Sequence, residues 1–356
     1  MGSATAWRLA AAGRRVALLE RFAAGHDRGS SHGATRIFRV AYRDPRYVEL
    51  AERALPLWRE LEDASGQVLL EQVGQLDHGH REAIDQIEAN LGAAGRRAER
   101  LTPMAAAERW PGMRFGDAVV FSPDGGRCWA ERTVTAAWTT AERLGAEIHF
   151  GTPVVQLEVA GDHAVVHTAD RSYRAPVVVV AAGAWAASLL AGLVALPELT
   201  VEAEQPSHFR PLDPSADWPS FLHHVPGPDG PGGDRLSFDA YGLLTPGEGV
   251  KVGGHGTTAR VDPDHRPDGP DPDRAAALVD YVQEWFPGLD PEPVSTTSCL
   301  FTSTPDEHFV LDRRGPVVVC SPCSGHGFKF VPAIADEVAQ LVSGRPQPVA
   351  AWHLPG

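Results

Sequence analysis

Residues that could bind an anion and act on it lie in three short segments of the chain. Residues 35–39 (TRIFR) carry two arginines three positions apart, residues 299–309 (CLFTSTPDEHF) begin with a cysteine, and residues 324–330 (SGHGFKF) hold a lysine between two phenylalanines. A lysine in apolar surroundings is costly without a partner, so Lys329 indicates a buried anion site such as one for an amino acid carboxylate. The arginines could instead share a solvated helix face, but residues 30–35 (SSHGAT) are poor helix formers.

Cys299 offers a thiol that could act as a nucleophile, although most cysteines in a chain of this kind are inert, buried and apolar. Cys320 and Cys323 have the Cys-x-x-Cys spacing of a redox motif. A zinc site would need a second such pair, which is absent from the sequence. We therefore predict no metal site.

Together the three segments resemble the monomeric sarcosine oxidase and N-methyltryptophan oxidase group, within the D-amino acid oxidase-like family of FAD-dependent enzymes. The resemblance covers nearly the whole chain and is thinnest between residues 205 and 245. It implies that Cys299 is joined to FAD through a thioether. It further implies that Arg39 and Lys329 bind the substrate carboxylate, while Thr35 and Arg36 lie against the flavin.

The resemblance also implies further cofactor contacts, notably in residues 183–190, where a strand end meets a helix. A plain strand-to-helix turn would account for that segment equally well. The additional cofactor-binding residues expected in this way are Val154, Gly183, Trp185, Gly325, Gly327 and Phe328.

The resemblance implies that Lys251 matches the lysine beside which reduced flavin reacts with dioxygen in the related enzymes. A fixed cation there would stabilise negative charge developing on oxygen. His255 lies four residues further along the same predicted strand, hence on the same face, and His326 aligns with another active-site histidine. Without the resemblance, Lys251 could equally be an exposed strand residue.

The first residues of the sequence match the second half of a dinucleotide-binding motif. Residues 1–13 predict a helix that ends at a glycine, and residues 14–20 predict a buried strand that ends at Glu20, the expected ribose-binding acid. Gly2 would be the third glycine of the motif, where a side chain would hold the helix away from the sheet. An ordinary helix-turn-strand is the alternative. We expect an upstream strand and two glycines to precede Met1, and a chain extended upstream to bind more flavin.

The remaining pattern predicts a mixed α/β fold with an N-terminally truncated, Rossmann-like FAD-binding domain and an inserted antiparallel-sheet substrate domain. The FAD-binding domain would comprise residues 1–45, 128–192 and 293–356, and the substrate domain residues 46–127 and 193–292. Residues 206–240 and 261–273 are rich in proline, glycine and aspartate, which predicts loops.

Composition narrows the possible partners. A net charge of −14 argues against nucleic acid and against an anionic membrane surface. No apolar run reaches the ~18–20 residues that span a bilayer, and four cysteines in 356 residues do not form a disulfide framework. We expect a cytoplasmic monomer.

The predicted activity is FAD-dependent oxidation of secondary, N-methyl amino acids by dioxygen, which yields an imine and hydrogen peroxide. No general base stands out in the sequence. Three alternatives stay open: an oxidase or dehydrogenase of a cyclic imino acid, a nicotinamide dehydrogenase suggested by Glu20, and a degenerate flavoprotein.

Overall fold

The computed structural model describes residues 1–225, 239–254, 260–267 and 269–355, and the predicted active-site residue His255 lies outside these ranges. The helices are α1 (Gly2–Ala11), α2 (Pro45–Ser65), α3 (Arg81–Ala93), α4 (Pro103–Arg109), α5 (Ala130–Arg143), α6 (Ala186–Leu190), α7 (Pro272–Trp285) and α8 (Val331–Val342). None of these helices has the length and apolar character needed to cross a membrane.

The strands are short and pair into several sheets. They are β1 (Ala17–Leu19), β2 (Thr35–Phe38), β3 (Leu70–Glu71), β4 (Gln75–Gly79), β5 (Glu99–Leu101), β6 (Ala118–Ser122), β7 (Gly126–Trp129), β8 (Glu147–His149), β9 (Gln156–Ala160), β10 (His163–His167), β11 (Ser172–Ala175), β12 (Val178–Val180), β13 (Thr200–Glu204), β14 (Ser207–Pro211), β15 (Ser220–His224), β16 (Ala240–Thr245), β17 (Gly249–Gly254), β18 (Leu289–Thr296), β19 (Cys299–Ser303), β20 (Val310–Arg314) and β21 (Val317–Ser321).

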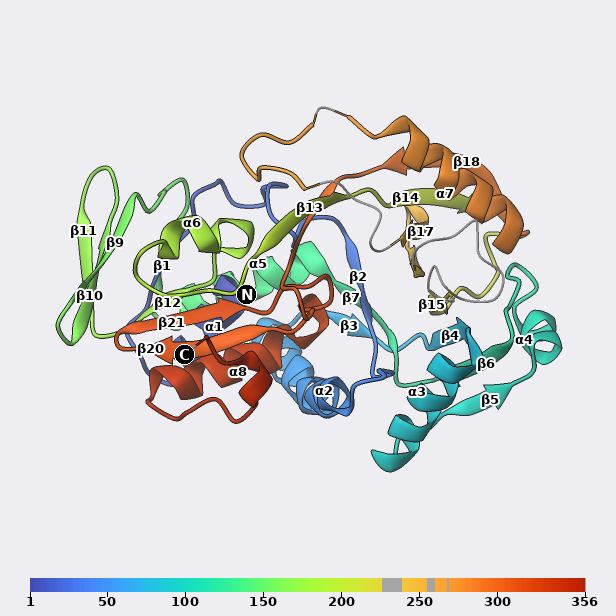
Figure 1. Cartoon of the computed structure of the whole chain (residues 1–356), viewed down its shortest axis with the longest axis horizontal. Coiled ribbons are helices and arrows are strands. Elements are labelled where there is room, and N and C mark those ends of the chain that lie inside the picture. The colour runs from blue at the N-terminus through green and yellow to red at the C-terminus, as the bar shows by residue number, and fades with distance from the viewer. Residues whose placement is uncertain (226–238, 255–259, 268, 356) are drawn as a thin grey trace.

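One half of the elongated molecule combines helices with short parallel strands, as Figure 1 shows. Helix α1 contacts both α5 and α8. Strand β1 pairs in parallel with β8, and β12 pairs in parallel with β21, whose other neighbour β20 is antiparallel. Strand β21 is buried along its whole length, as expected for a valine-rich strand in a parallel pair. The helix and strand predicted at the start of the chain are present as α1 and β1. The strand is not buried as predicted, because Ala17 is exposed and Leu18 and Leu19 are only partly buried.

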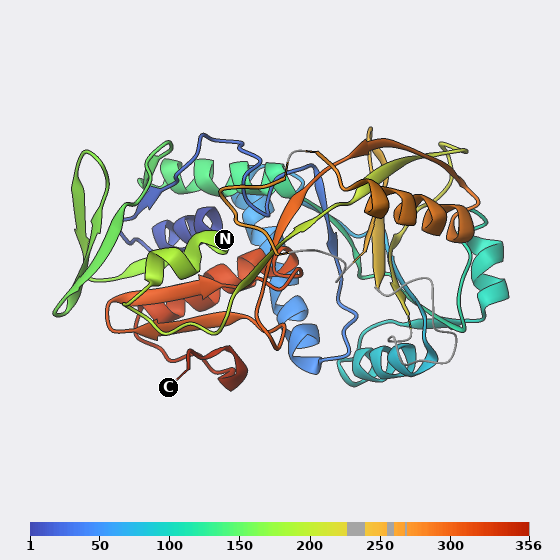
Figure 2. The same ribbon diagram turned by 45° about the horizontal axis from the view of Figure 1, so that its top comes forward.

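The other half is built on an eight-stranded sheet in the order β18-β14-β17-β16-β15-β4-β6-β5, with α7 beside it in Figure 2. Side chains alternate between its faces. Val250 and Val252 belong to the core cluster that includes Leu278 of α7, whereas Lys251 between them points to the opposite face. The α/β fold class is confirmed, and the sheet is mixed because β4 and β15 run in parallel. The domain boundaries stay a prediction.

The loop prediction for residues 206–240 is wrong in part, because β14 and β15 are strands of the large sheet. The sequence predicted a loop because the prolines and aspartates between these two strands outnumber the apolar residues. Strand β14 has Phe209 fully buried, and all of β15 is buried. Tertiary burial therefore overrides local propensity here.

Three local structures bring the chemistry-bearing segments together. Strand β2 pairs with β7, and β19 pairs with β13, which fixes Thr35 and Cys299 in regular strands. Helix α2 starts at Pro45, after Asp44 caps it by accepting a hydrogen bond from the Arg46 amide. Within α2, the buried Trp58 donates its Nε1–H to the carbonyl of Lys329 at 2.9 Å, which anchors the turn that carries the lysine.

Candidate active site

One cavity of about 2150 Å³ runs between the short strands and the large sheet. Its walls include residues from all three predicted segments. The site residues predicted from the sequence that line it are Gly2, Glu20, Thr35, Arg36, Arg39, Val154, Gly183, Trp185, Lys251, Cys299, Gly325, His326, Gly327, Phe328 and Lys329. Every predicted site residue that falls within the described ranges thus contributes to a single cavity, although the role of each stays a prediction.

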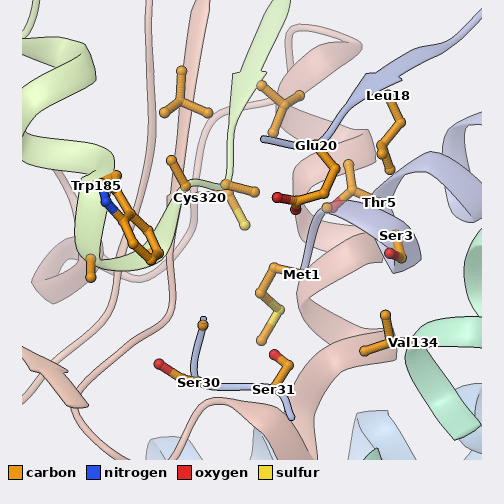
Figure 3. Close-up of a pocket in the computed structure, with 18 of the residues that line it drawn as sticks. Met1, Ser3, Thr5, Leu18, Glu20, Ser30, Ser31, Val134, Trp185 and Cys320 are labelled. Atoms are coloured by element: carbon orange, nitrogen blue, oxygen red, sulfur yellow. The ribbon is translucent and has the colours of Figure 1, made fainter. Parts of the chain in front are cut away.

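The end of the cavity near α1 has features that suit a dinucleotide (Figure 3). Met1 at the start of α1, Glu20 after β1, and Trp185 face the same space. The positive end of a helix favours a phosphate, and a carboxylate after the second strand of such a motif favours a ribose hydroxyl. The Glu20 Oε1 atom accepts a hydrogen bond from the Phe22 amide at 2.9 Å, which orients the carboxylate.

The steric reason predicted for Gly2 is wrong. A Cβ atom placed on Gly2 would lie 3.9 Å from the Cβ atom of Ala181, which is an ordinary van der Waals contact. The helix could therefore carry a small side chain there without moving away from β12.

Cys299 lies in a strongly cationic part of the cavity. Its Sγ atom is 3.2 Å from Nε2 of His32 and 3.7 Å from a guanidinium nitrogen of Arg36. Although burial raises the pKa of this thiol, Arg36, His32 and Lys251 together lower it to about 7. The cations around Cys299 therefore favour its thiolate, the form in which cysteine acts as a nucleophile.

Two other buried thiols differ from Cys299, because burial outweighs the influence of nearby cations on their pKa values. Burial raises the pKa of both Cys128 and Cys320 to about 12. Sequence reasoning singled out Cys299 but missed His32, whose only signal was its position four residues before Arg36.

The two lysines in the sequence, Lys251 and Lys329, are both 7% exposed and both line this cavity. The Nζ atom of Lys251 donates to the carbonyl of Thr35 at 3.2 Å, and that of Lys329 donates to the carbonyl of His326 at 3.0 Å. Burial and the nearby Arg36 lower the pKa of Lys251 to about 8. Burial and the nearby Arg39 hold the pKa of Lys329 well below its usual range.

Arg39 and Lys329 converge on one aromatic ring. The Arg39 guanidinium carbon lies 3.9 Å from the centroid of the Tyr42 ring, and Lys329 Nζ lies 5.9 Å from the same centroid. Tyr42 therefore holds the two cations near each other by cation–π attraction, despite their mutual repulsion. The sequence analysis named both cations and missed the tyrosine between them.

The four cavity cations that the sequence analysis singled out have no carboxylate partner among the described residues. Across the described part of the chain, no Asp or Glu oxygen lies within 4.0 Å of the charged nitrogens of Arg36, Arg39, Lys251 and Lys329, while most other arginines form such ion pairs. A buried cation without an anion is costly, so this arrangement is suited to anionic ligands. Arg36 instead donates to the carbonyls of Thr35, Ser30 and His32.

His326 has a more structural setting than its alignment implies. Its ring packs edge-on against Tyr47 at 4.6 Å and lies 4.8 Å from Phe309. Its Nε2 atom is 3.3 Å from the carbonyl oxygen of Glu307. These contacts place the ring in an aromatic cluster at the border of the cavity.

Comparison with known proteins agrees with this geometry. Residues 1–341 match the family model described as "FAD dependent oxidoreductase". The chain is 32% identical to monomeric sarcosine oxidase of Bacillus sp. (strain NS-129), with 96% of this chain and 90% of that protein covered. It is 27% identical to N-methyl-L-tryptophan oxidase of Yersinia pestis (strain Pestoides F), with 98% and 94% covered.

Solved structures have the same fold. NikD, described as an unusual amino acid oxidase essential for nikkomycin biosynthesis, superposes with a TM-score of 0.87 at 27% identity, covering 99% of this chain and 94% of that one. L-proline dehydrogenase from P. horikoshii gives a TM-score of 0.83 at 22% identity, covering 99% and 93%.

Proposed function

Because the chain belongs to the family of FAD-dependent oxidoreductases, we propose that it oxidises secondary, N-methyl amino acids with dioxygen as the electron acceptor. The observation that carries this proposal is the group of four cations without carboxylate partners, around one nucleophilic thiol in one cavity. FAD, when bound, would accept the two electrons that leave with the α-hydrogen when the C–N single bond becomes an imine. A peroxide assay with sarcosine, other N-methyl amino acids and cyclic imino acids tests the activity.

We assign Arg39 and Lys329 to the substrate carboxylate. Both are cations, both contact the Tyr42 ring, and Lys329 is held by the turn that Trp58 anchors. A carboxylate bound between Arg39 and Lys329 would neutralise their positive charge and accept charge-assisted hydrogen bonds from both side chains. The substrate amine would then lie on the side of the carboxylate that faces the flavin. The side chain that the pocket accepts stays open between acyclic N-methyl amino acids and cyclic imino acids.

We further propose that Cys299 attaches FAD covalently. The sulfur would bond to a methyl carbon of the flavin ring as a C–H proton leaves, and the two electrons would pass through the ring to dioxygen. Support comes from the thiolate character of Cys299 and from Arg36 and His32 beside its sulfur. A covalent bond would keep the ring next to Lys251.

The charge of Arg36 should set the pH dependence of the Cys299 reaction. In flavin-free protein, alkylation of Cys299 by iodoacetamide should rise with pH through a midpoint at about 7, because the thiolate forms over that range. Arg36→Gln removes the largest lowering influence on the pKa, so the midpoint should move upward, whereas Arg43→Gln on an exposed side chain should leave it unchanged. Mass spectrometry of the alkylated peptide measures both. An unchanged midpoint in Arg36→Gln would contradict this role.

Lys251 is assigned to the reaction with dioxygen. Its ammonium group is buried and held by the Thr35 carbonyl, so it presents a preorganised positive charge to the developing anion. Lys251→Met should slow reoxidation of the reduced flavin by about 10²–10³-fold, the range for loss of one preorganised donor. Reduction by substrate should change much less. Stopped-flow measurement of the two half-reactions separates them, and equal slowing of both would contradict the assignment.

We also propose that the protein is a cytoplasmic monomer. The four cysteines are free and none pairs with another, as is usual in a reducing compartment. Several relatives are named monomeric sarcosine oxidase. Sedimentation of the purified protein tests the oligomeric state.

A further inference from the structure

His208 lies directly beside Lys251 in the large sheet. The two residues are register partners in the antiparallel pair of β14 and β17, so their side chains leave the same face. Opposite residues in such a pair have Cβ atoms about 4.5–5.5 Å apart. Both residues line the cavity, and only 3% of His208 is exposed. The lysine assigned to dioxygen therefore has a buried imidazole as its immediate neighbour.

The buried imidazole is connected to the surface through Glu248. Its Nδ1 atom is 3.3 Å from the Ser295 hydroxyl, and its Nε2 atom is 3.2 Å from a carboxylate oxygen of Glu248, whose side chain is 48% exposed. The buried Nε2 atom makes no hydrogen bond of good geometry within the described residues. Exposure thus increases from Lys251 and His208 to Glu248, from the cavity to the surface.

Other charged groups around Lys251 do not offer such a connection. Arg36 and Cys299 act on its charge from inside the cavity, and Glu131 acts from α5. His208 can both accept and donate a proton, unlike the Arg36 guanidinium, and unlike Cys299 it is not the proposed site of the thioether. Burial and the charge of Lys251 lower the pKa of His208 to about 4, so the ring is neutral near pH 7 and its Nε2 side, which faces Glu248, can take up a proton and release it again.

The reaction with dioxygen has a proton requirement. Each dioxygen takes two electrons and two protons to become hydrogen peroxide. Reduced flavin supplies both electrons and one proton from its ring nitrogen, and the second proton must come from the protein or from water. If Lys251 gives this proton, its amine must be reprotonated before the next turnover, although it is almost fully buried.

We propose that Glu248 and His208 conduct that proton from solvent to Lys251. The inference rests on the proposed role of Lys251 in the oxygen reaction. In each turnover one proton enters at Glu248, passes through the imidazole and a water between the ring and Lys251 Nζ, and restores the ammonium group. The step moves only a proton, so no further oxidant or reductant is needed.

The two lysines make a direct measurement possible. With ¹⁵N-lysine, the flavin-loaded protein gives two Nζ signals, which Lys251→Met assigns, and exchange of their protons with water can be followed by NMR. His208→Asn and Glu248→Gln should slow exchange at Lys251 and leave Lys329 unchanged. His265→Asn, on an exposed histidine that pairs with Asp262, is the matched control and should change neither signal.

The same variants should slow flavin reoxidation. We expect a loss of about 10²-fold for His208→Asn, the lower end of the range for a positioned proton donor, and a smaller loss for Glu248→Gln. Glu248 is half exposed, so its variant remains informative if His208→Asn folds poorly. Unchanged exchange at Lys251 in both variants would overturn the proton path. Normal reoxidation in Lys251→Met would instead refute the oxygen site itself, which separates the two failures.

Discussion

Replacing Cys299 with alanine should release the flavin into the supernatant when the protein is precipitated with acid. The flavin of the unaltered protein should stay in the pellet. The reason is that the other thiols of the cavity, Cys320 and Cys323, have raised pKa values and cannot substitute for it at neutral pH. The measurement is the absorbance of the pellet and the supernatant after precipitation of the purified protein. Essentially all of the bound flavin should be in the pellet for the unaltered protein and in the supernatant for Cys299→Ala.

Cys323→Ala is the matched control, because Cys323 lines the same cavity. Its flavin should stay in the pellet. Retention of flavin in the Cys299→Ala pellet would contradict the thioether, and its loss in Cys323→Ala would transfer the attachment to that residue.

Arg39→Ala should weaken carboxylate substrates by about 10²-fold in kcat/KM, since losing one partner of a buried charge pair costs about 2–5 kcal/mol. The effect should be far smaller for neutral amines, which bring no anion to this position. Steady-state peroxide release with an N-methyl amino acid and its amide measures the difference. Arg43→Ala, on an exposed neighbouring arginine, should leave both substrates unaffected. Equal losses for acid and amide would contradict a carboxylate site.

Lys329→Met should produce a similar loss of activity together with equal or higher thermal stability. Burial disfavours the charged form of Lys329, as its lowered pKa indicates, and no carboxylate compensates it in the described structure, so an apolar side chain of similar shape removes a cost of burial from the folded protein. Thermal unfolding of the substrate-free protein and peroxide release measure the two effects. A large fall in Tm would show that Lys329 is needed for folding rather than for ligand binding.

The sequence allowed prediction of those site residues whose environment is local. Lys329 lies between two phenylalanines, and Arg36 and Arg39 lie in a stretch that does not favour helix, so each residue carried its own signal. The helices α2, α5 and α8 were predictable for a similar reason, because their apolar positions repeat with the helical period.

Features that depend on long-range pairing were not predictable. His208 gains its position from the register of β14 against β17, and β14 itself lies in a region whose prolines and glycines favour loops. The low pKa of Cys299 depends on His32 and Arg36, which reach its sulfur only when residues far apart in the sequence come together. Likewise, the absence of carboxylate oxygens within 4.0 Å of the four cations in the described structure is a property of the packed cavity.

The central claim is that this cationic cavity holds a flavin ring bonded to Cys299. Peptide mapping of the denatured, protease-digested holoprotein by mass spectrometry tests it most directly. A flavin mass on the peptide that contains residues 299–309, with the other three cysteines unmodified, is the expected result. Unmodified Cys299 in protein that carries a full complement of FAD would contradict it.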